Sequence, residues 1–520
     1  MSASRTFCAL PYIFFLCLGV ALSGCSTLPS QENRSASAAF DDTGNTRLGK
    51  AVTPRVSANP GYSGVHPLAG HDAFAARLLL MSVAERSLDV QYYIWNKDMT
   101  GTLLFNGLYE AAERGVRVRL LLDDGNTSGL DPILAALDAH PNIEVRLFNP
   151  FVVRGVRLLN FFDFSRLNRR MHNKSFTADN EVTIVGGRNV GDQYFGAPGG
   201  VMFVDVDVLA VGPVVKAVSN IFDQYWASES SYPVERLLPK ADSDAFAELA
   251  SAISRVQNAP ATEEYVSAVR DSSLIRELVA GQLSLEWAAT RVISDDPAKG
   301  LGLAAPEALM LHKLKQVIGT PSSELNLVSP YFVPGAAAVA AFTALAKQGV
   351  QIRVLTNSLE ATDVVSVYAG YAKSRKPLLQ AGVQLYEIPR LLPDAVRQFK
   401  SDGRKPSGSS KSGLHAKTFS VDQARIFVGS FNLDPRSEKL NTEMGFIIES
   451  PTLARRISNT FLHAVPDNTY QLGLSDSGHL YWIKRLKEGG QLQYEVSPGT
   501  TFLQRAGVWF ISLLPIDWLL

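Results

Sequence analysis

Cysteine is almost absent from this chain of 520 residues. The 3 cysteines, Cys8, Cys17 and Cys25, all lie within the first 25 positions. The remaining 495 positions therefore hold no internal disulfide and no thiol nucleophile, which excludes a disulfide-stapled scaffold and cysteine-based catalysis.

An excess of charge of one sign is also lacking. Lys and Arg total 50, Asp and Glu total 50, and the net charge is zero. A nucleic-acid-binding protein of this size usually carries a basic excess or stripe, so the balance argues against a nucleic-acid partner. Hydrophobic residues make up 46% and charged residues 19%, close to the average for globular domains, so we expect a large buried core.

A long hydrophobic run is missing too, although a short one opens the chain. Arg5 is the only charge before the apolar stretch 7–22, which is short for a permanent membrane span. Leu22-Ser23-Gly24-Cys25 has the form of a lipobox, which predicts a lipoprotein signal peptide at 1–25 and acylation of Cys25. The alternative is an uncleaved signal anchor. Either reading puts the chain on a membrane, and lipidation predicts the periplasmic face, with inner and outer membrane left open.

The first structured half is predicted to begin near residue 71. Ser, Ala, Asn, Gly and Pro dominate 26–70, which predicts a flexible linker. Apolar periodicity beyond it predicts alternating elements. We expect helices at 75–83, 101–114 and 130–139, and strands at 88–94, 116–122 and 143–147.

The second half repeats this order. Strands are expected at 325–329, 351–355 and 383–388, and helices at 336–347 and 365–381. The sequence thus predicts an α/β protein with two similar lobes, 71–236 and 301–500, each a mainly parallel sheet flanked by helices and related by a pseudo-twofold axis. A helical segment at 237–300 would connect them, and an apolar tail at 501–520 would follow.

One short pattern occurs once in each half. It reads H-x-K-x-x-x-x-D, and an Asn follows each His by 17 positions, after a strand that ends in Gly-Gly or Gly-Ser. A lone His is usually a satisfied core or surface residue, but two copies with matched flanks predict one shared site. The members are His172, Lys174, Asp179 and Asn189 in the first copy, and His415, Lys417, Asp422, Ser430 and Asn432 in the second.

These residue types suit transfer at a phosphodiester. Alternate side chains of a strand share a face, so each His is expected beside its Lys. Two lysines and two amides can hold the charge that gathers on phosphate oxygens in the transition state, so no metal or other cofactor is required. One imidazole would attack phosphorus, and the other would protonate the leaving oxygen.

The chain resembles the phospholipase D superfamily, the HKD enzymes, and within it the bacterial cardiolipin synthase branch, closest to its C type. The resemblance runs from about residue 72 to the C-terminus. It is carried by 88–95, 117–124, 166–192, 294–300, 329–334, 355–358, 414–449 and 514–520.

That resemblance implies residue roles. His172 would be the nucleophile and His415 the acid and base, although symmetry alone does not decide between them. Asp205 and Glu443 match positions that orient a histidine through its second nitrogen, with Asp207 as the rival for Asp205. Asp179 and Asp422 belong to the motif, but we expect them to lock local structure rather than touch substrate.

The resemblance also implies a phosphatidyltransferase that makes cardiolipin from phosphatidylglycerol and a second phospholipid, either phosphatidylethanolamine or phosphatidylglycerol. Hydrolysis by a phospholipase D is the near alternative, and a nuclease or an inactive lipid-binding lipoprotein are more distant ones. Beside the first motif, the segment 151–164 alternates bulky apolar residues with arginines. It either contacts acyl chains and anionic headgroups or is a buried loop with solvated arginines.

Overall fold

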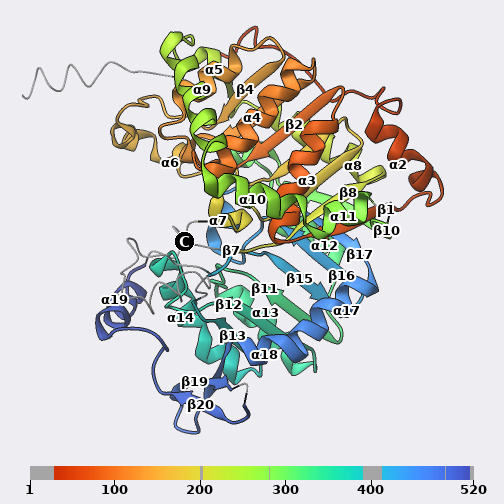
Figure 1. The fold of residues 1–520 in the computed structure, drawn as a ribbon. Helices are drawn as coiled ribbons and strands as arrows, with labels where there is room; N and C mark the ends of the chain where they lie inside the picture. The colour runs from red at the N-terminus through yellow and green to blue at the C-terminus, as the bar shows by residue number, and fades with distance from the viewer. Residues whose placement is uncertain (1–27, 199–202, 280–281, 391–412, 487, 516–520) are drawn as a thin grey trace, which may run out of the picture.

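The computed structural model describes residues 28–198, 203–279, 282–390, 413–486 and 488–515. Two lobes lie one above the other, the first in red to green and the second in green to blue (Figure 1). The predicted signal peptide and Cys25 lie outside the described residues, as does the end of the predicted tail. Within the part of the chain that is described, no helix is long and apolar enough to cross a membrane.

The first lobe is built on one sheet, whose strands run in the order β9-β4-β3-β2-β5-β6-β8-β1. Their bounds are β1 Ser63–Leu68, β2 Ser87–Tyr92, β3 Arg117–Asp123, β4 Ile143–Phe148, β5 Ser175–Ala178, β6 Val182–Gly186, β8 Asp207–Val211 and β9 Ser231–Pro233.

The second lobe repeats the arrangement in the order β20-β19-β18-β13-β12-β11-β15-β16-β17-β10. Its strands are β10 Glu286–Ser294, β11 Glu324–Val328, β12 Gln351–Asn357, β13 Gln384–Ile388, β15 Thr418–Val421, β16 Arg425–Gly429, β17 Met444–Glu449, β18 Tyr470–Leu474, β19 Leu480–Arg485 and β20 Gln491–Tyr494. The matching central order, from β4 to β1 and from β13 to β10, confirms the predicted duplication.

Strand direction differs from the prediction of mainly parallel sheets. Among the described strands, parallel pairing within a lobe is limited to β2, β3 and β4 in the first lobe and to β11, β12 and β13 in the second. The other pairings are antiparallel, and two of them, β5 with β6 and β15 with β16, are hairpins closed by tight turns. Asp179, Asn180, Asp422 and Gln423 form those turns with positive φ of 50–52°.

Helices cover both faces of each sheet. Their bounds are α2 Arg47–Ser57, α3 Gly70–Val83, α4 Met99–Glu113, α5 Asp131–Asp138, α6 Phe164–Leu167, α7 Asp192–Phe195, α8 Pro213–Trp226, α9 Ser243–Gln257, α10 Pro260–Arg270, α11 Ser273–Val279, α12 Met310–Ile318, α13 Ala336–Lys347, α14 Val365–Gln380, α16 Pro435–Lys439, α17 Pro451–Asn459, α18 Val465–Asn468 and α19 Phe502–Ser512. The helices predicted within the two lobes are confirmed.

Alternation along β3 shows how one sheet serves two layers. Leu120 and Leu122 pack in the core under α3, α4 and α5, whereas Leu121 packs on the other face with Phe222 and Trp226 of α8. All three leucines are fully buried, as expected for a strand covered on both sides.

The lobes are joined by hydrogen bonds as well as by packing. β1 pairs antiparallel with β10, Gly64 opposite Trp287, so the two sheets are continuous. A second bridge pairs β7 (Phe203–Val204) with β14 (Gly413–Leu414). A shared apolar cluster unites both sheets, including Val185 of β6 and Phe446 of β17.

Two predicted boundaries need correction, those of the linker and of the connecting segment. The residues 47–68, expected in a flexible linker, form α2 and β1, and β1 is a full member of the first sheet. These two elements were not predicted, because the segment is mainly polar in composition and β1 has only six residues. The connecting segment contains the expected helices α9, α10 and α11 but ends in β10, which belongs to both sheets. Most of the tail folds as α19, beside α14.

Candidate active site

Both motif histidines lie at the junction of the lobes. Each directly precedes a strand of its own lobe, β5 or β15, and each backbone N–H donates across the junction. The His172 N–H donates to Thr442 O at 2.9 Å, and the His415 N–H donates to Val204 O at 2.8 Å. The two sequence motifs, 243 positions apart, are thus both fixed against the opposite lobe, and both side chains are buried.

Each imidazole is held by a carboxylate from the other lobe. His172 Nδ1 lies 2.8 Å from Glu443 Oε2, and His415 Nδ1 lies 2.6 Å from Asp205 Oδ2. These partners are the ones expected from sequence, although their exchange between lobes was not. Because Nδ1 is engaged in both rings, Nε2 is the nitrogen available for chemistry.

Asp205 and its rival Asp207 have separate partners. Asp207 Oδ2 accepts from Arg77 at 2.8 Å and from Arg188 at 3.2 Å, all within the first lobe. Asp207 therefore neutralises buried arginines, and Asp205 is the one of the two that contacts a histidine, as preferred from the sequence.

The motif lysines lie against their own histidines, as the strand alternation predicts. Lys174 Nζ donates to His172 O at 2.6 Å, and Lys417 Nζ donates to His415 O and lies 3.1 Å from His415 Nδ1. Both ammonium groups are buried, with Asp205 and Glu443 as nearby opposite charges. The junction thus brings two lysines together where an anionic group could contact them, and burial lowers the pKa of both.

The amides and Ser430 surround this pair of lysines and histidines. Asn189 Oδ1 accepts from the Ile94 N–H at 3.3 Å, and its Nδ2 donates to Tyr194 Oη at 3.2 Å. Ser430 Oγ donates to Glu443, so it positions the partner of His172. Asn432 is buried, and its side-chain oxygen has no hydrogen-bond partner among the described residues.

Burial and the two lysines lower the pKa of both histidines. Burial is the larger cause, followed by Lys174 and Lys417 for His172, and by Lys417 for His415, whose pKa falls to about 4. Burial also lowers the pKa of Lys417 to about 8. Both rings are therefore neutral at neutral pH in the empty site.

The two carboxylates are shifted in opposite directions. Burial raises the pKa of Glu443 to about 7, with Lys174 opposing it. Burial also opposes ionisation of Asp205, but His415 and Lys417 outweigh it and hold its pKa well below the usual range. The two halves of the site are thus similar in geometry but unequal in charge.

Asp179 and Asp422 lie at the far ends of β5 and β15, away from the histidines. Asp179 accepts the backbone N–H groups of 85–87 at the start of β2. Asp422 accepts those of 322–324 at the start of β11. The motif aspartates are therefore structural: they fix the entry to the neighbouring strand, and neither belongs among the catalytic residues.

Comparisons with known proteins agree with this geometry. The family described as cardiolipin synthase, PLD-like domain, matches residues 78–226 and 314–465. The chain belongs to this family. Cardiolipin synthase C of Escherichia coli is 49% identical over 91% of this chain and all of its own length. An uncharacterised protein of Helicobacter pylori is 30% identical over 97% of this chain and 99% of its own length.

A crystal structure of phosphatidylserine synthase from Haemophilus influenzae has the same fold. The match has a TM-score of 0.50 at 15% identity and covers 81% of this chain and 91% of the other. Since the family model matches once in each lobe, the chain carries two copies of the phospholipase D-like unit that characterises these cardiolipin synthases.

Three aromatic residues contact the histidines of the site and were not expected from the sequence. The Tyr93 ring lies edge-on to His172 at 4.9 Å, and Lys174 Nζ lies 5.3 Å from the same ring. Tyr194 and Phe203 pack on His415 at 5.2 and 5.5 Å. Tyr93 directly follows the fully buried strand β2, and that position was the available signal.

A buried brace behind Glu443 was also missed. Asp295 Oδ2 accepts from the Glu443 N–H at 2.9 Å and from Lys299 Nζ at 2.9 Å. Lys299 in turn donates to Ser437 O at 2.8 Å. The run Asp295 to Lys299, quoted above only for its resemblance, thus fixes the partner of His172.

Neither sequence interpretation of the segment 151–164 holds for its arginines, which are neither solvated nor free to bind headgroups, and the same is true of Arg166, which follows the segment. Arg154 pairs with Asp124 and Asp131, both at 2.5 Å, and Arg157 donates to Asp124 O at 2.8 Å. Arg166 pairs with Asp163 at 2.6 Å. The charges of this segment are satisfied internally, and its bulky apolar side chains are the ones that face solvent.

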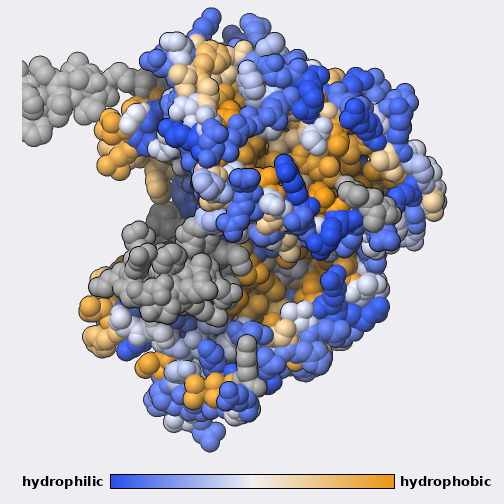
Figure 2. All heavy atoms as spheres, viewed as in Figure 1, coloured by the Kyte–Doolittle hydropathy of each residue, from blue (hydrophilic) through white to orange (hydrophobic). Residues whose placement is uncertain are grey.

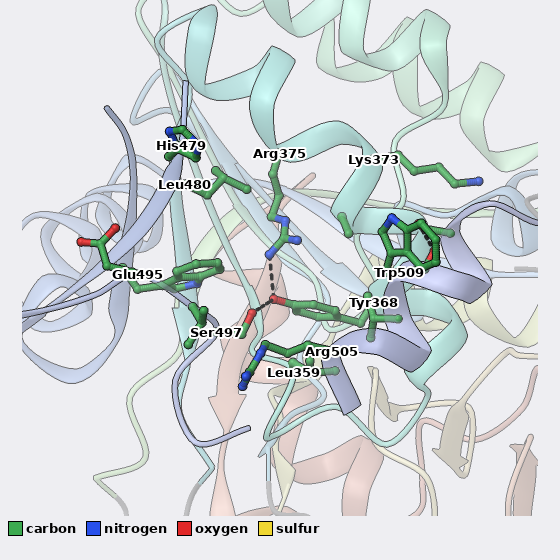
Figure 3. Close-up of a pocket in the computed structure, with 15 residues that line it drawn as sticks. Leu359, Tyr368, Lys373, Arg375, His479, Leu480, Glu495, Ser497, Arg505 and Trp509 are labelled. Carbon is green, nitrogen blue, oxygen red and sulfur yellow. Dashed lines mark hydrogen bonds between the residues drawn. The ribbon is translucent and has the colours of Figure 1, made fainter. Parts of the chain in front are cut away.

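A cavity of about 570 Å³ lies in the second lobe, between α14, β19 and α19 (Figure 3). Tyr368 Oη accepts from Arg375 at 2.8 Å within it, and the Arg375 guanidinium lies over the Trp482 ring. No motif residue lines this cavity. Among the described residues there is also no group of three potential metal ligands.

Proposed function

We propose that this chain is a phosphatidyltransferase that makes cardiolipin. A phosphatidyl group passes from one phospholipid to His172, and then to a glycerol hydroxyl of phosphatidylglycerol. The single observation that carries the proposal is the exchange of carboxylates, which fixes His172 on Glu443 and His415 on Asp205 at 2.8 and 2.6 Å across one lobe junction.

In the first step, His172 Nε2 attacks phosphorus and forms an N–P bond. The P–O bond to the donor headgroup breaks, and protonated His415 gives its Nε2 proton to the leaving oxygen. In the second step, neutral His415 takes the proton of the glycerol hydroxyl, the oxygen attacks phosphorus, and the N–P bond breaks. His172 is thereby regenerated, and His415 is again protonated.

The low pKa of His415 fits this cycle because the substrate is an anion. Burial and Lys417 hold the ring neutral when the site is empty. A phosphodiester bound at the two lysines adds a negative charge, which offsets theirs and raises the pKa of His415. The general acid would therefore form when the donor binds.

The charge difference between the carboxylates supports the assignment of roles. Asp205 is held ionised, and an ionised partner stabilises an imidazolium at His415. Glu443, with its pKa raised to about 7, gives His172 less such support. His415 is thus the better proton carrier, and His172 the better neutral nucleophile.

The lysines and asparagines would hold the equatorial oxygens of the transferring phosphoryl group. Lys174, Lys417, Asn189 and Asn432 are all buried at the junction. Asn432 Oδ1 has no hydrogen-bond partner within the described ranges and could accept from an acceptor hydroxyl. This charge arrangement requires no cofactor.

A lipid assay tests the proposal. The purified chain is incubated with phosphatidylglycerol, with and without phosphatidylethanolamine, and the lipids are separated. Cardiolipin is the expected product, and dependence on phosphatidylethanolamine would name the donor. Phosphatidic acid alone would mean that the same site carries out hydrolysis instead of transfer. If neither product formed, the proposal would be refuted.

The nucleophile is tested by trapping. In His415→Ala, a phosphatidyl donor with a p-nitrophenol leaving group needs no general acid, so the covalent intermediate should form and persist. We expect one burst of p-nitrophenol and a phosphorylated peptide that contains His172. A label on another residue, or a burst that survives His172→Ala, would reverse the assignment.

The same proposal extends to place. From the lipobox-like end of the export signal, we propose that acylated Cys25 anchors the enzyme at the periplasmic face of a bacterial membrane, where its phospholipid substrates lie. Several acyl chains on one residue give stable anchoring, whereas one is marginal.

A further inference from the structure

Two clusters of large apolar side chains are exposed, one on each lobe. The first patch is Leu158, Leu159, Phe161, Phe162 and Phe164, on the turn before α6 and on α6 itself, with exposed fractions of 48–82%. The second patch is Phe502, Leu503, Trp509, Phe510 and Leu513, on and beside α19, with exposed fractions of 60–79%. Contiguous apolar surface of this kind marks an interaction site on a folded protein.

The first patch is held out by its own ion pairs. Arg154 and Arg157 turn inward to Asp124, and Arg166 pairs with Asp163. Asn160 adds three hydrogen bonds that close the turn, to the backbone of Val153 and Arg157. The segment is therefore a braced projection whose tip is apolar, not a loose loop that could fold its phenylalanines away.

The second patch is one face of an amphipathic helix. A capping box of Thr501 and Gln504 begins α19, and Val508 is the residue of the helix that is buried against the second lobe. Trp509 lies at the edge of the cavity under the helix (Figure 3). Ile511 also packs against that core, whereas Phe502, Leu503 and Phe510 of α19 are exposed.

Both patches lie on the same side of the molecule. α6 and α19 project on the left of the view, above and below the junction of the lobes (Figure 1). Apolar side chains are exposed on both projections (Figure 2). α7 and β7 lie between the lobes on this side, and they carry Tyr194 and Phe203, which contact His415.

We propose that the two patches insert together into one phospholipid leaflet, so that the junction between them opens onto the membrane surface. This rests on the proposed function, since both substrates would be bilayer lipids. Leucine, phenylalanine and tryptophan are the side chains that bury favourably at the boundary of headgroups and acyl chains. Two separated points of insertion would fix the orientation of the enzyme, which a single anchor cannot do.

The start of the described chain agrees with this orientation. Arg34 donates to Ser228 O at 2.7 Å and to Ser231 O at 3.1 Å, and the Asn149 N–H donates to Ser230 O at 2.8 Å. The chain start thus lies beside a turn that also contacts Asn149, two residues before the segment 151–164 that carries the first patch.

The insertion would be apolar rather than electrostatic. The arginines of the first patch are already paired with aspartates, so little positive charge remains there for anionic headgroups. Binding through the patches should therefore occur on neutral phosphatidylcholine and change little with salt.

Dyes at single cysteines test the insertion. With Cys8, Cys17 and Cys25 all replaced by Ser, the chain offers no other thiol, so Phe162→Cys, Phe510→Cys and Tyr62→Cys can each be labelled alone. Each protein is placed in phosphatidylcholine vesicles that carry a nitroxide on the acyl chain. We expect quenching at 162 and 510, and none at 62, which is 49% exposed and directly precedes β1, on the opposite side of the molecule (Figure 1).

The same parent without an introduced cysteine is the blank. Absence of quenching at 162 and 510 would overturn the proposal, and quenching at one position alone would overturn simultaneous insertion. Dyes that become shielded from aqueous quencher, but not quenched by the nitroxide lipid, would instead mean that a second copy of the chain covers the patches.

Activity separates this proposal from the proposed function. In Leu158→Ser/Phe162→Ser, and separately in Phe510→Ser, transfer on phosphatidylglycerol vesicles should fall about tenfold or more, since burying one large apolar side chain changes an equilibrium by about that factor. Transfer on short-chain phosphatidylglycerol, dissolved as monomers, should be unchanged. Equal loss on both substrates would refute the docking role, whereas a parent chain inactive on both would refute the proposed function and leave the dye result intact.

Discussion

Replacing Asp205 by Asn would test the proton-transfer half of the site. The substitution keeps the size of the side chain but removes the charge beside His415 Nδ1, at 2.6 Å. An amide NH₂ in that place favours an unprotonated Nδ1, which puts the ring proton on Nε2. A ring in that tautomer cannot take the proton of the acceptor hydroxyl.

The size of the effect follows from the charge that is lost. Asp205 raises the pKa of His415 and so opposes the effects of burial and Lys417. Loss of an opposite charge at this range changes a pKa by about 1–3 pH units, so the protonated form of His415 becomes correspondingly scarcer. Together with the tautomer change, we expect kcat to fall by about 10²–10⁴.

The pH profile of transfer is the decisive measurement. For Asp205→Asn, the limb that reports protonated His415 should move to lower pH, and a donor with a p-nitrophenol leaving group should recover the first step. Asp207→Asn is the matched control, because Asp207 contacts Arg77 and Arg188 instead of a histidine. It should lower Tm without moving the profile. A reduced kcat with an unmoved profile in Asp205→Asn would refute the proton-transfer role.

Four further outcomes are expected. Gly187→Ala should lower kcat about tenfold or more with a folded core, because the added Cβ would lie 2.7 Å from Asp205 Oδ1; an unchanged rate would mean that Asp205 tolerates displacement. Asp422→Asn should cost about 1–2 kcal/mol in urea unfolding after allowance for its partial exposure. Since backbone N–H groups outweigh burial and lower the pKa of Asp422 to about 2, this difference should be present above pH 4, vanish as the pH falls toward 2, and leave kcat unaltered. Lys174→Met should lower kcat/KM by about 10²–10³. EDTA should leave the activity of both the wild-type chain and Lys174→Met unchanged, and a loss of activity with EDTA would instead indicate a metal-dependent site. Globomycin should block maturation of the precursor, and Cys25→Ser should be insensitive to it.

The residues of the site could be predicted largely because the duplication gave each signal an internal control. His172 and His415 were found from matched spacing, and strand alternation placed each lysine beside its histidine. Asp205 and Asp207 lie on the same face of an extended segment, so spacing alone could not separate them. The distinction lies in Arg77, which is distant in sequence and occupies Asp207.

What sequence reasoning missed depends on contacts between segments far apart in the chain. The exchange of Glu443 and Asp205 between lobes requires knowledge of how the sheets meet. β1 is a short strand within a mainly polar stretch of sequence, and its position is set by pairing with β8 and β10. Arg154 and Arg157 were expected to contact headgroups or to be solvated, because their partner Asp124 belongs to another segment of the chain.

The β1–β10 ladder has a consequence for how substrates reach the two catalytic histidines and how water is excluded from them. Two lobes linked by a loop could open and close like a jaw, and closure would shed water around the reacting groups. Here the two sheets are continuous, because β1 pairs at 63–65 with β10 at 286–288, so no hinge separates the lobes at this ladder. Water must then be excluded from the histidines by whatever fills the entrance to the site, and the acyl chains of the bound lipids would fill it.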